Sequence, residues 1–247
     1  MNKGKYLPYF LPVRAVIFFL VFVVGAAVVG ADVRDIGNWW SIVASAVNIV
    51  TIVMLVLLAK GAGKSYGELI NYKKEKRSLK TLILIPLGIV VIGMSGMYLA
   101  GFICYGAMFP GVSLEVIAPV PAVLAIINMV VLPLTVPFAE DGLYLGCGVS
   151  RIKNKYAAIF VPAFFYAFQH CFIPTFFDVR YMLYRFLSFL PLTIILCWYY
   201  YKKRDPVPIM IGHAALDVAT ASMILMTSVI PGFYEEMCSM AAGTVGQ

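Results

Sequence analysis

The chain has 247 residues, of which 62% are hydrophobic and only 13% are charged. Because a soluble globular domain carries about 25% charged residues, this composition and a mean hydropathy of +0.91 exclude an ordinary soluble protein. The net charge of +7 is gathered in a few short segments, which is typical of membrane orientation signals and not of nucleic-acid binding. The five cysteines show no paired spacing, so the sequence indicates neither a disulfide framework nor a zinc ribbon.

Apolar runs of roughly the 20 residues that a membrane-spanning helix needs recur along the chain. The runs are continuously apolar, which favours helices over the alternating strands of a membrane β-barrel. We therefore expect an all-α, polytopic transmembrane bundle of about seven spans with a cytoplasmic N-terminus. The predicted spans are 10–31, 39–59, 81–100, 118–148, 156–173, 182–201 and 207–230.

The fourth predicted span is longer than a straight crossing requires and contains four prolines, which predict a kinked or tilted helix. We expect one integral membrane domain in three parts. Residues 1–117 would form three N-terminal helices with a basic loop at 60–80, residues 118–230 a core of the remaining four helices, and residues 231–247 a short tail.

The basic residues predict the orientation of the bundle. Most of the 19 lie in four segments that a seven-span topology places on one side of the membrane. These segments are the N-terminus with Lys3, Lys5 and Arg14, the loop 60–80, the loop 149–155 and the turn 202–205. By the positive-inside rule, this side is the cytoplasm.

Two histidines and three carboxylates lie inside the predicted spans: His170, His213, Glu140, Asp141 and Asp217. Ionisable side chains are costly in hydrocarbon and are kept mainly where they pair, line a cavity or do chemistry. The spacing of His213 and Asp217 places them on one helix face, whereas the adjacent Glu140 and Asp141 diverge by about 100° around a helix. We expect the set to converge within the membrane, with His170 somewhat deeper than the others.

A carboxylate beside two imidazoles can perform two kinds of chemistry. It can activate a water molecule and stabilise an oxyanion. Alternatively, Glu140, His170 and His213 correspond to the ligand set of a catalytic zinc site with an open position. The local His-Glu-x-x-His zinc signature is absent from the sequence, and a divalent metal such as zinc stays an open alternative.

Three segments carry a family resemblance. The stretch PFAEDGLYLG, Pro137 to Gly146, is similar to Pro-x-x-Glu-Glu-x-x-x-Arg-Gly; YAFQH, Tyr166 to His170, is similar to Phe-x-x-x-His; and HAALD, His213 to Asp217, is similar to His-x-x-x-Asn/Asp. On these motifs, and on the basic turn KKRDP before the last, the chain resembles the CPBP (CAAX protease and bacteriocin-processing, or Abi) family. These intramembrane proteases include the Ras-converting CAAX prenyl endopeptidases, and the resemblance covers about residues 118–225.

The resemblance implies an intramembrane hydrolase, either a glutamate-type protease or a metalloprotease. Glu140 would activate the attacking water with help from His170, and His213 and Asp217 would hold the oxyanion and the scissile carbonyl. Asp141 would support Glu140.

We expect Tyr166 and Tyr144 to contact the substrate. The expected partners are the lipid bilayer and a peptide or lipidated, CAAX-like C-terminal segment that enters from the cytoplasmic side. No nucleic-acid partner is expected, and no cofactor is required in the favoured mechanism.

The chain departs from the family motif at Leu145, where the family has arginine, at Asp141, where it has a second glutamate, and at Tyr166, where it has phenylalanine. Leu145 favours one alternative, a non-catalytic peptide-binding or bacteriocin-immunity membrane protein. A transporter or proton relay is a further alternative because those proteins also use buried carboxylates and histidines, but the sequence shows no inverted repeat.

Overall fold

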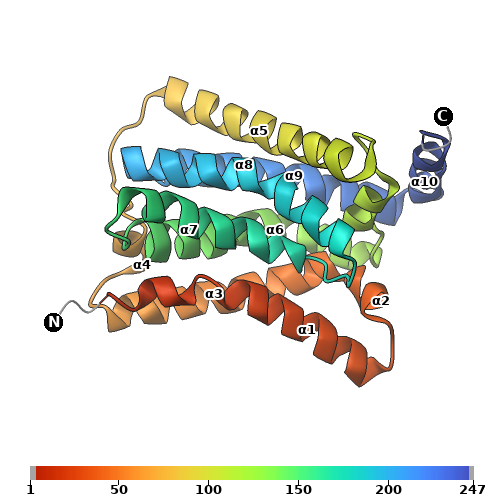
Figure 1. The fold of residues 1–247 in the computed structure, drawn as a ribbon, viewed down its shortest axis with the longest axis horizontal. Coiled ribbons are helices and arrows are strands. Elements are labelled where there is room, and N and C mark those ends of the chain that lie inside the picture. The colour runs from red at the N-terminus through yellow and green to blue at the C-terminus, as the bar shows by residue number, and fades with distance from the viewer. Residues whose placement is uncertain (1–3, 245–247) are drawn as a thin grey trace.

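The computed structural model describes residues 4–244 and confirms an all-α bundle (Figure 1). Six of its helical segments are long and apolar enough to cross a membrane. These six are Leu7–Val29 (η1, Leu7–Phe10, and α1, Val13–Val29), α3 (Trp40–Gly61), α5 (Leu79–Tyr105), Ala122–Val149 (α6, Ala122–Asp141, and η3, Gly142–Val149), α8 (Val179–Lys203) and α9 (Val207–Val229). The shorter elements are α2 (Val33–Gly37), α4 (Tyr66–Leu69), η2 (Gly111–Ile117), α7 (Lys155–Phe168), η4 (Gln169–Cys171) and α10 (Phe233–Thr244).

The predicted span 156–173 differs from the other six. It forms the 14-residue helix α7 and then tightens into the 3₁₀ turn η4, so it is shorter than the roughly 20 residues of a full crossing. The apolar run therefore includes the turn that carries His170. Although it is short, α7 runs alongside the long helices in the middle of the bundle (Figure 1).

The helices lie nearly parallel, with α5 along one edge of the bundle and α1 and α3 along the opposite edge (Figure 1). Between these edges, α6 packs on α9 and on α3, α8 packs on α5 and α7, and α1 reaches the turn η4. The segments that carry the three motifs therefore occupy the interior of the bundle. Because α1 and α3 cover them on one side, the N-terminal helices are in a position to contribute to any site there.

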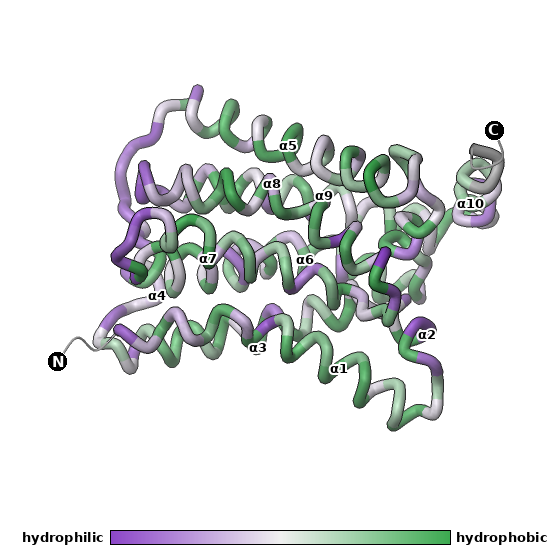
Figure 2. The backbone as a smooth tube through the Cα atoms, viewed as in Figure 1, coloured by the Kyte–Doolittle hydropathy of each residue, from purple (hydrophilic) through white to green (hydrophobic). Residues whose placement is uncertain are grey.

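The hydrophilic connections gather at the end of the bundle that holds α4 and the N-terminus (Figure 2). The loops 60–80 and 149–155 and the turn 202–205 share this end, as the charge pattern predicted, whereas α10 lies at the opposite end. Which end faces the cytoplasm stays a prediction. Lys3 lies outside the described residues, and Arg14 is not an end charge, because it lies within α1 and is fully buried.

The fourth span changes helix type along its length, and the kink or tilt that its prolines predict stays a prediction. After Asp141, α6 widens into the π-helical segment η3, although Pro133 and Pro137 lie inside α6. At Gly142, an added Cβ would lie 2.5 Å from the Tyr66 hydroxyl, and that hydroxyl donates a hydrogen bond to the Phe138 carbonyl at 2.6 Å. A glycine here therefore lets Tyr66 approach the backbone directly beside the two motif carboxylates.

Helix contacts in this bundle depend on small residues, which gives a matched test within α5. An added Cβ at Gly96 would lie 2.6 Å from the Ser188 carbonyl oxygen of α8, whereas at Gly88 it would meet nothing within 4 Å. Alanine favours a helix over glycine at both positions, but at Gly96 overpacking should cost about 1–3 kcal/mol. We expect Gly96→Ala to lower the thermal unfolding temperature in detergent. Gly88→Ala should not lower it, and equal effects of the two changes would contradict this packing.

Candidate functional site

Glu140 lies at the end of α6 and is only 4% exposed. Its two carboxylate oxygens have different surroundings. Oε1 accepts a hydrogen bond from Arg14 Nη2 at 2.8 Å. Oε2 has no hydrogen-bond partner among residues 4–244 and lies 3.8 Å from His213 Nε2. One oxygen is thus anchored, and the other is free to bind a further molecule.

The partner of Glu140, Arg14, was not anticipated as a site residue. Its side chain is fully buried in α1, with Cζ 5.3 Å from the centroid of the Phe18 ring, and its other hydrogen bonds go to neutral oxygens. Nε donates to Gln169 Oε1 at 2.7 Å, Nη1 to Thr51 Oγ1 at 3.0 Å and Nη2 also to Asn48 Oδ1 at 2.9 Å. The guanidinium therefore ties α1 to α3, to the turn η4 and to Glu140. An arginine within an apolar run was the available signal in the sequence, but it was interpreted as an orientation charge.

A second group centres on the hydroxyl of Tyr166. This hydroxyl donates to Asp141 Oδ1 at 3.0 Å and lies 3.0 Å from His213 Nδ1. The other oxygen of Asp141, Oδ2, lies 3.4 Å from the same imidazole nitrogen. Glu140 and Asp141, which diverge around the helix, thus approach opposite edges of one imidazole ring. The carboxylates and His213 form a single buried network.

Asp217 lies one turn beyond His213 on α9, as their spacing predicted. Its Oδ2 is 3.8 Å from His213 Nε2, and its side chain is 18% exposed. His213 Nε2 is therefore 3.8 Å from one oxygen of Asp217 and 3.8 Å from one oxygen of Glu140. This nitrogen faces both carboxylates without a close hydrogen bond to either.

His170 is on the turn η4 and is 7% exposed. Its Nδ1 lies 2.9 Å from the backbone carbonyl oxygen of Tyr166. Because a carbonyl oxygen can only accept, Nδ1 carries the proton of this bond, and Nε2 of the neutral ring has a free lone pair. The ring stacks on Phe189 of α8, with centroids 3.5 Å apart.

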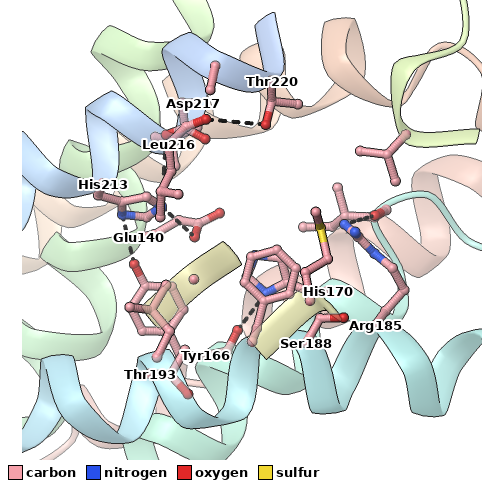
Figure 3. A pocket seen from close by; sticks show the side chains of 18 of the residues that line it. Glu140, Tyr166, His170, Arg185, Ser188, Thr193, His213, Leu216, Asp217 and Thr220 are labelled. Carbon is pink, nitrogen blue, oxygen red and sulfur yellow. Dashed lines mark hydrogen bonds and ion pairs between the residues drawn. The ribbon is translucent and has the colours of Figure 1, made fainter. Parts of the chain in front are cut away.

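These side chains surround one cavity of about 170 Å³ (Figure 3). Its polar lining includes members of all three motifs, and most of its other lining residues are apolar. The motif residues that line it are Glu140, Tyr166, His170, His213 and Asp217. Trp40, the first residue of α3, and Val116 of η2 also line the cavity. The predicted opening toward the cytoplasmic side stays a prediction.

The two tyrosines expected to contact substrate have different positions. Tyr166 lines the cavity, but Tyr144 is fully buried and is not among the lining residues. Tyr144 stacks on the Tyr166 ring with centroids 4.4 Å apart, and its hydroxyl donates to Gln169 Oε1 at 3.2 Å. In this arrangement Tyr144 supports Tyr166 and does not reach the cavity itself.

The structure gives no ready-made ligand set for zinc. Within the described part of the chain, no group of three or more His, Cys, Asp and Glu side chains is arranged to hold one metal ion. Glu140 Oε1 is engaged by Arg14, and His170 Nδ1 by a backbone carbonyl. These contacts leave Glu140 Oε2 and His170 Nε2 unengaged, so the alternative ligand set Glu140, His170 and His213 stays a prediction.

Comparison with known families identifies the segment that carries the motifs. Residues 122–219 match a family model described as type II CAAX prenyl endopeptidase Rce1-like. This segment is an Rce1-like domain of the CPBP family. No curated protein and no solved structure matches the chain.

The Rce1-like domain contains all three motifs but not the side chains that hold Glu140 in place. Arg14 and its partners Asn48 and Thr51 precede the matched segment and come from α1 and α3. Within the domain, Leu145 stands at the motif position of an arginine and is fully buried in η3. The guanidinium beside Glu140 thus reaches the Rce1-like domain from a different helix.

The Arg14–Glu140 pair gives a prediction about stability. Arg14→Leu leaves Glu140 buried without its cation, which should cost about 3–5 kcal/mol of unfolding free energy. The double variant Arg14→Leu/Glu140→Leu removes both charges and should recover much of this loss. Thermal unfolding in detergent measures both effects, with Arg34→Leu as the control because Arg34 belongs to an exposed ion pair. A double variant no more stable than Arg14→Leu alone would contradict the pairing.

Proposed function

We propose that the chain is an intramembrane endopeptidase in which Glu140 activates the water that hydrolyses a peptide bond. The observation that carries this proposal is the unequal state of the Glu140 oxygens. Arg14 anchors Oε1, while Oε2 is unpartnered among the described residues, and the residue lines the cavity. A positioned carboxylate with a free oxygen is suited to take a proton from water.

The reaction would proceed by addition and elimination. A water molecule between Glu140 and His170 gives one proton to Glu140 Oε2, and its oxygen forms a bond to the carbonyl carbon of the substrate. The Nε2 lone pair of His170 accepts the hydrogen bond of the second water proton and orients the attack. The C–N bond then breaks, and Glu140 returns its proton to the leaving nitrogen. The new carboxyl group keeps the second water proton until it passes to the released amine, so the final products are a carboxylate and an ammonium group.

The hydrogen-bonded network of Tyr166, Asp141 and His213 would stabilise the oxyanion that forms when water adds to the substrate carbonyl. Tyr166 and Asp141 hold Nδ1 of His213, which leaves Nε2 toward the cavity. In its doubly protonated form, His213 would donate from Nε2 to the oxyanion, with Asp217 Oδ2 facing the same nitrogen at 3.8 Å. Donors that are fixed before the reaction stabilise the developing charge most effectively.

Leu145 replaces the arginine of the family motif, and Arg14 is the residue that could compensate for this loss. An arginine in the family motif would place a guanidinium near the motif carboxylates, and here Arg14 bonds directly to Glu140 from α1. We propose that Arg14 replaces the motif arginine as the cation that holds the motif carboxylates in position. The proposal favours an active protease over the non-catalytic alternative that Leu145 suggested.

The family match supports a peptide substrate. The six candidate membrane spans support a substrate that is associated with the membrane. We propose that this substrate is a lipidated, CAAX-like C-terminal segment, because the cavity has an extensive apolar lining from α5 and α8 beside the polar cluster. The apolar residues on these two helices include Val90, Met94, Met97, Leu192 and Leu196.

Replacement of Glu140 tests the proposal directly. In proteoliposomes, Glu140→Gln should reduce cleavage of a farnesylated CAAX peptide by roughly 10²- to 10⁴-fold, because the amide cannot accept the water proton. Mass spectrometry of the products measures the rate, and thermal unfolding confirms that the variant is folded. Glu75→Gln in the exposed basic loop is the matched control. Undiminished cleavage by Glu140→Gln would reject the assignment and favour a non-catalytic role.

Chelation separates the glutamate mechanism from the metal mechanism. Because the described side chains offer no three-ligand metal set, we expect cleavage to continue after incubation with 1,10-phenanthroline and EDTA. A loss of activity that added zinc restores would contradict this expectation and indicate that the site rearranges around a metal.

A further inference from the structure

Arg185 is a buried cation that the proposed mechanism does not use. It lies on α8, inside a candidate membrane span, and is only 3% exposed. It lines the same cavity as Glu140 and His213, at some distance from them across the cavity (Figure 3). A full charge at such depth is costly and marks a functional position by default.

The guanidinium of Arg185 is only partly satisfied. Nη2 donates to the Ile173 carbonyl at 2.9 Å, and Cζ lies 5.1 Å from the centroid of the Phe189 ring. Nε is buried and has no partner within residues 4–244. In the same part of the chain, no carboxylate forms an ion pair with Arg185, whereas the other buried arginine, Arg14, is paired with Glu140. Arg185 therefore keeps an uncompensated positive charge at the wall of the cavity.

Phe189 lies between the two groups in question, because its ring contacts both Arg185 and the proposed catalytic residue His170. The Phe189 ring stacks on His170, with centroids 3.5 Å apart, and the same ring lies beneath the guanidinium of Arg185. His170 and Arg185 thus both contact the ring of Phe189, so they lie close to each other. Because an extended peptide advances about 3.3 Å per residue, a short stretch of peptide is enough to join the two.

We infer that Arg185 forms a subsite for the free C-terminal carboxylate of the peptide substrate. This inference rests on the proposed function, since the carboxylate would anchor a chain whose scissile bond lies between Glu140 and His170. A guanidinium matches a carboxylate through two parallel hydrogen bonds, and such charge-assisted bonds are strong where water is excluded. The bound substrate would supply the negative charge that the protein lacks at this position. The subsite would restrict cleavage to positions near the ends of chains.

Two peptides that differ only at the C-terminus test the subsite. One is a farnesylated CAAX peptide with a free carboxylate, and the other is its C-terminal amide. We expect the wild-type protein to cleave the acid with a kcat/KM roughly 10- to 100-fold higher, mainly through KM, because the amide lacks the charge. In Arg185→Met the acid-to-amide ratio should fall to about one, and in Arg185→Lys it should be intermediate.

Arg180→Met is the matched control, because Arg180 is an exposed arginine near the start of the same helix. It should keep the wild-type preference for the acid. If Arg185 only holds the Ile173 carbonyl, its replacement would slow both peptides equally and leave their ratio unchanged, which overturns the subsite. Equal cleavage of acid and amide by the wild type would also overturn it, even if Arg185→Met failed to fold.

Binding to the Glu140→Gln variant separates the subsite from the proposed function. Microscale thermophoresis should show tighter binding of the acid than of the amide, and this difference should disappear in Glu140→Gln/Arg185→Met. If the wild type cleaves neither peptide but this difference persists, the protease proposal fails and the carboxylate subsite stands. If cleavage occurs without any difference between acid and amide, the protease proposal stands and the subsite fails.

Discussion

The ion pair between Arg14 and Glu140 is the interaction on which the site depends. Both side chains are almost completely buried in a bundle of apolar helices, where an unpaired charge is costly. The same guanidinium also bonds to Asn48, Thr51 and Gln169. The pair therefore stabilises one carboxylate oxygen and at the same time fixes the positions of α1, α3 and the turn η4 around it.

The geometry of the rest of the site follows from that anchor. With Oε1 of Glu140 engaged, Oε2 remains without a partner among the described residues, near His213. Asp141, the next residue, turns to the other side of the same imidazole and meets Tyr166 there. The π-helical segment that starts directly after Asp141 is typical of functional positions, because a local change of helix type re-aims side chains at the cost of regular hydrogen bonding.

The two buried arginines illustrate how charge is used differently around one site, since Arg185 lines the cavity and Arg14 holds Glu140 from behind it. Arg14 is satisfied by a carboxylate and three neutral acceptors, so it acts as a fixed part of the scaffold. Arg185 is held by a single backbone carbonyl and an aromatic ring. A satisfied charge supports structure, whereas an unsatisfied charge beside a cavity is suited to bind an anion. The proposed roles of the two residues follow from this contrast.

The sequence by itself determined the class of the protein, the positions of six long helices and the residues that carry the motifs. These properties are local: span length follows from bilayer thickness, and the i,i+4 spacing of His213 and Asp217 follows from helix geometry. Only the tertiary structure decided what meets at the site. Arg14 and Glu140 are 126 residues apart, and no periodicity links an arginine in the first apolar run with a carboxylate in the fourth. Likewise, the short α7, the turn at His170 and the withdrawal of Tyr144 behind Tyr166 depend on packing between helices, which a one-dimensional hydropathy pattern does not contain.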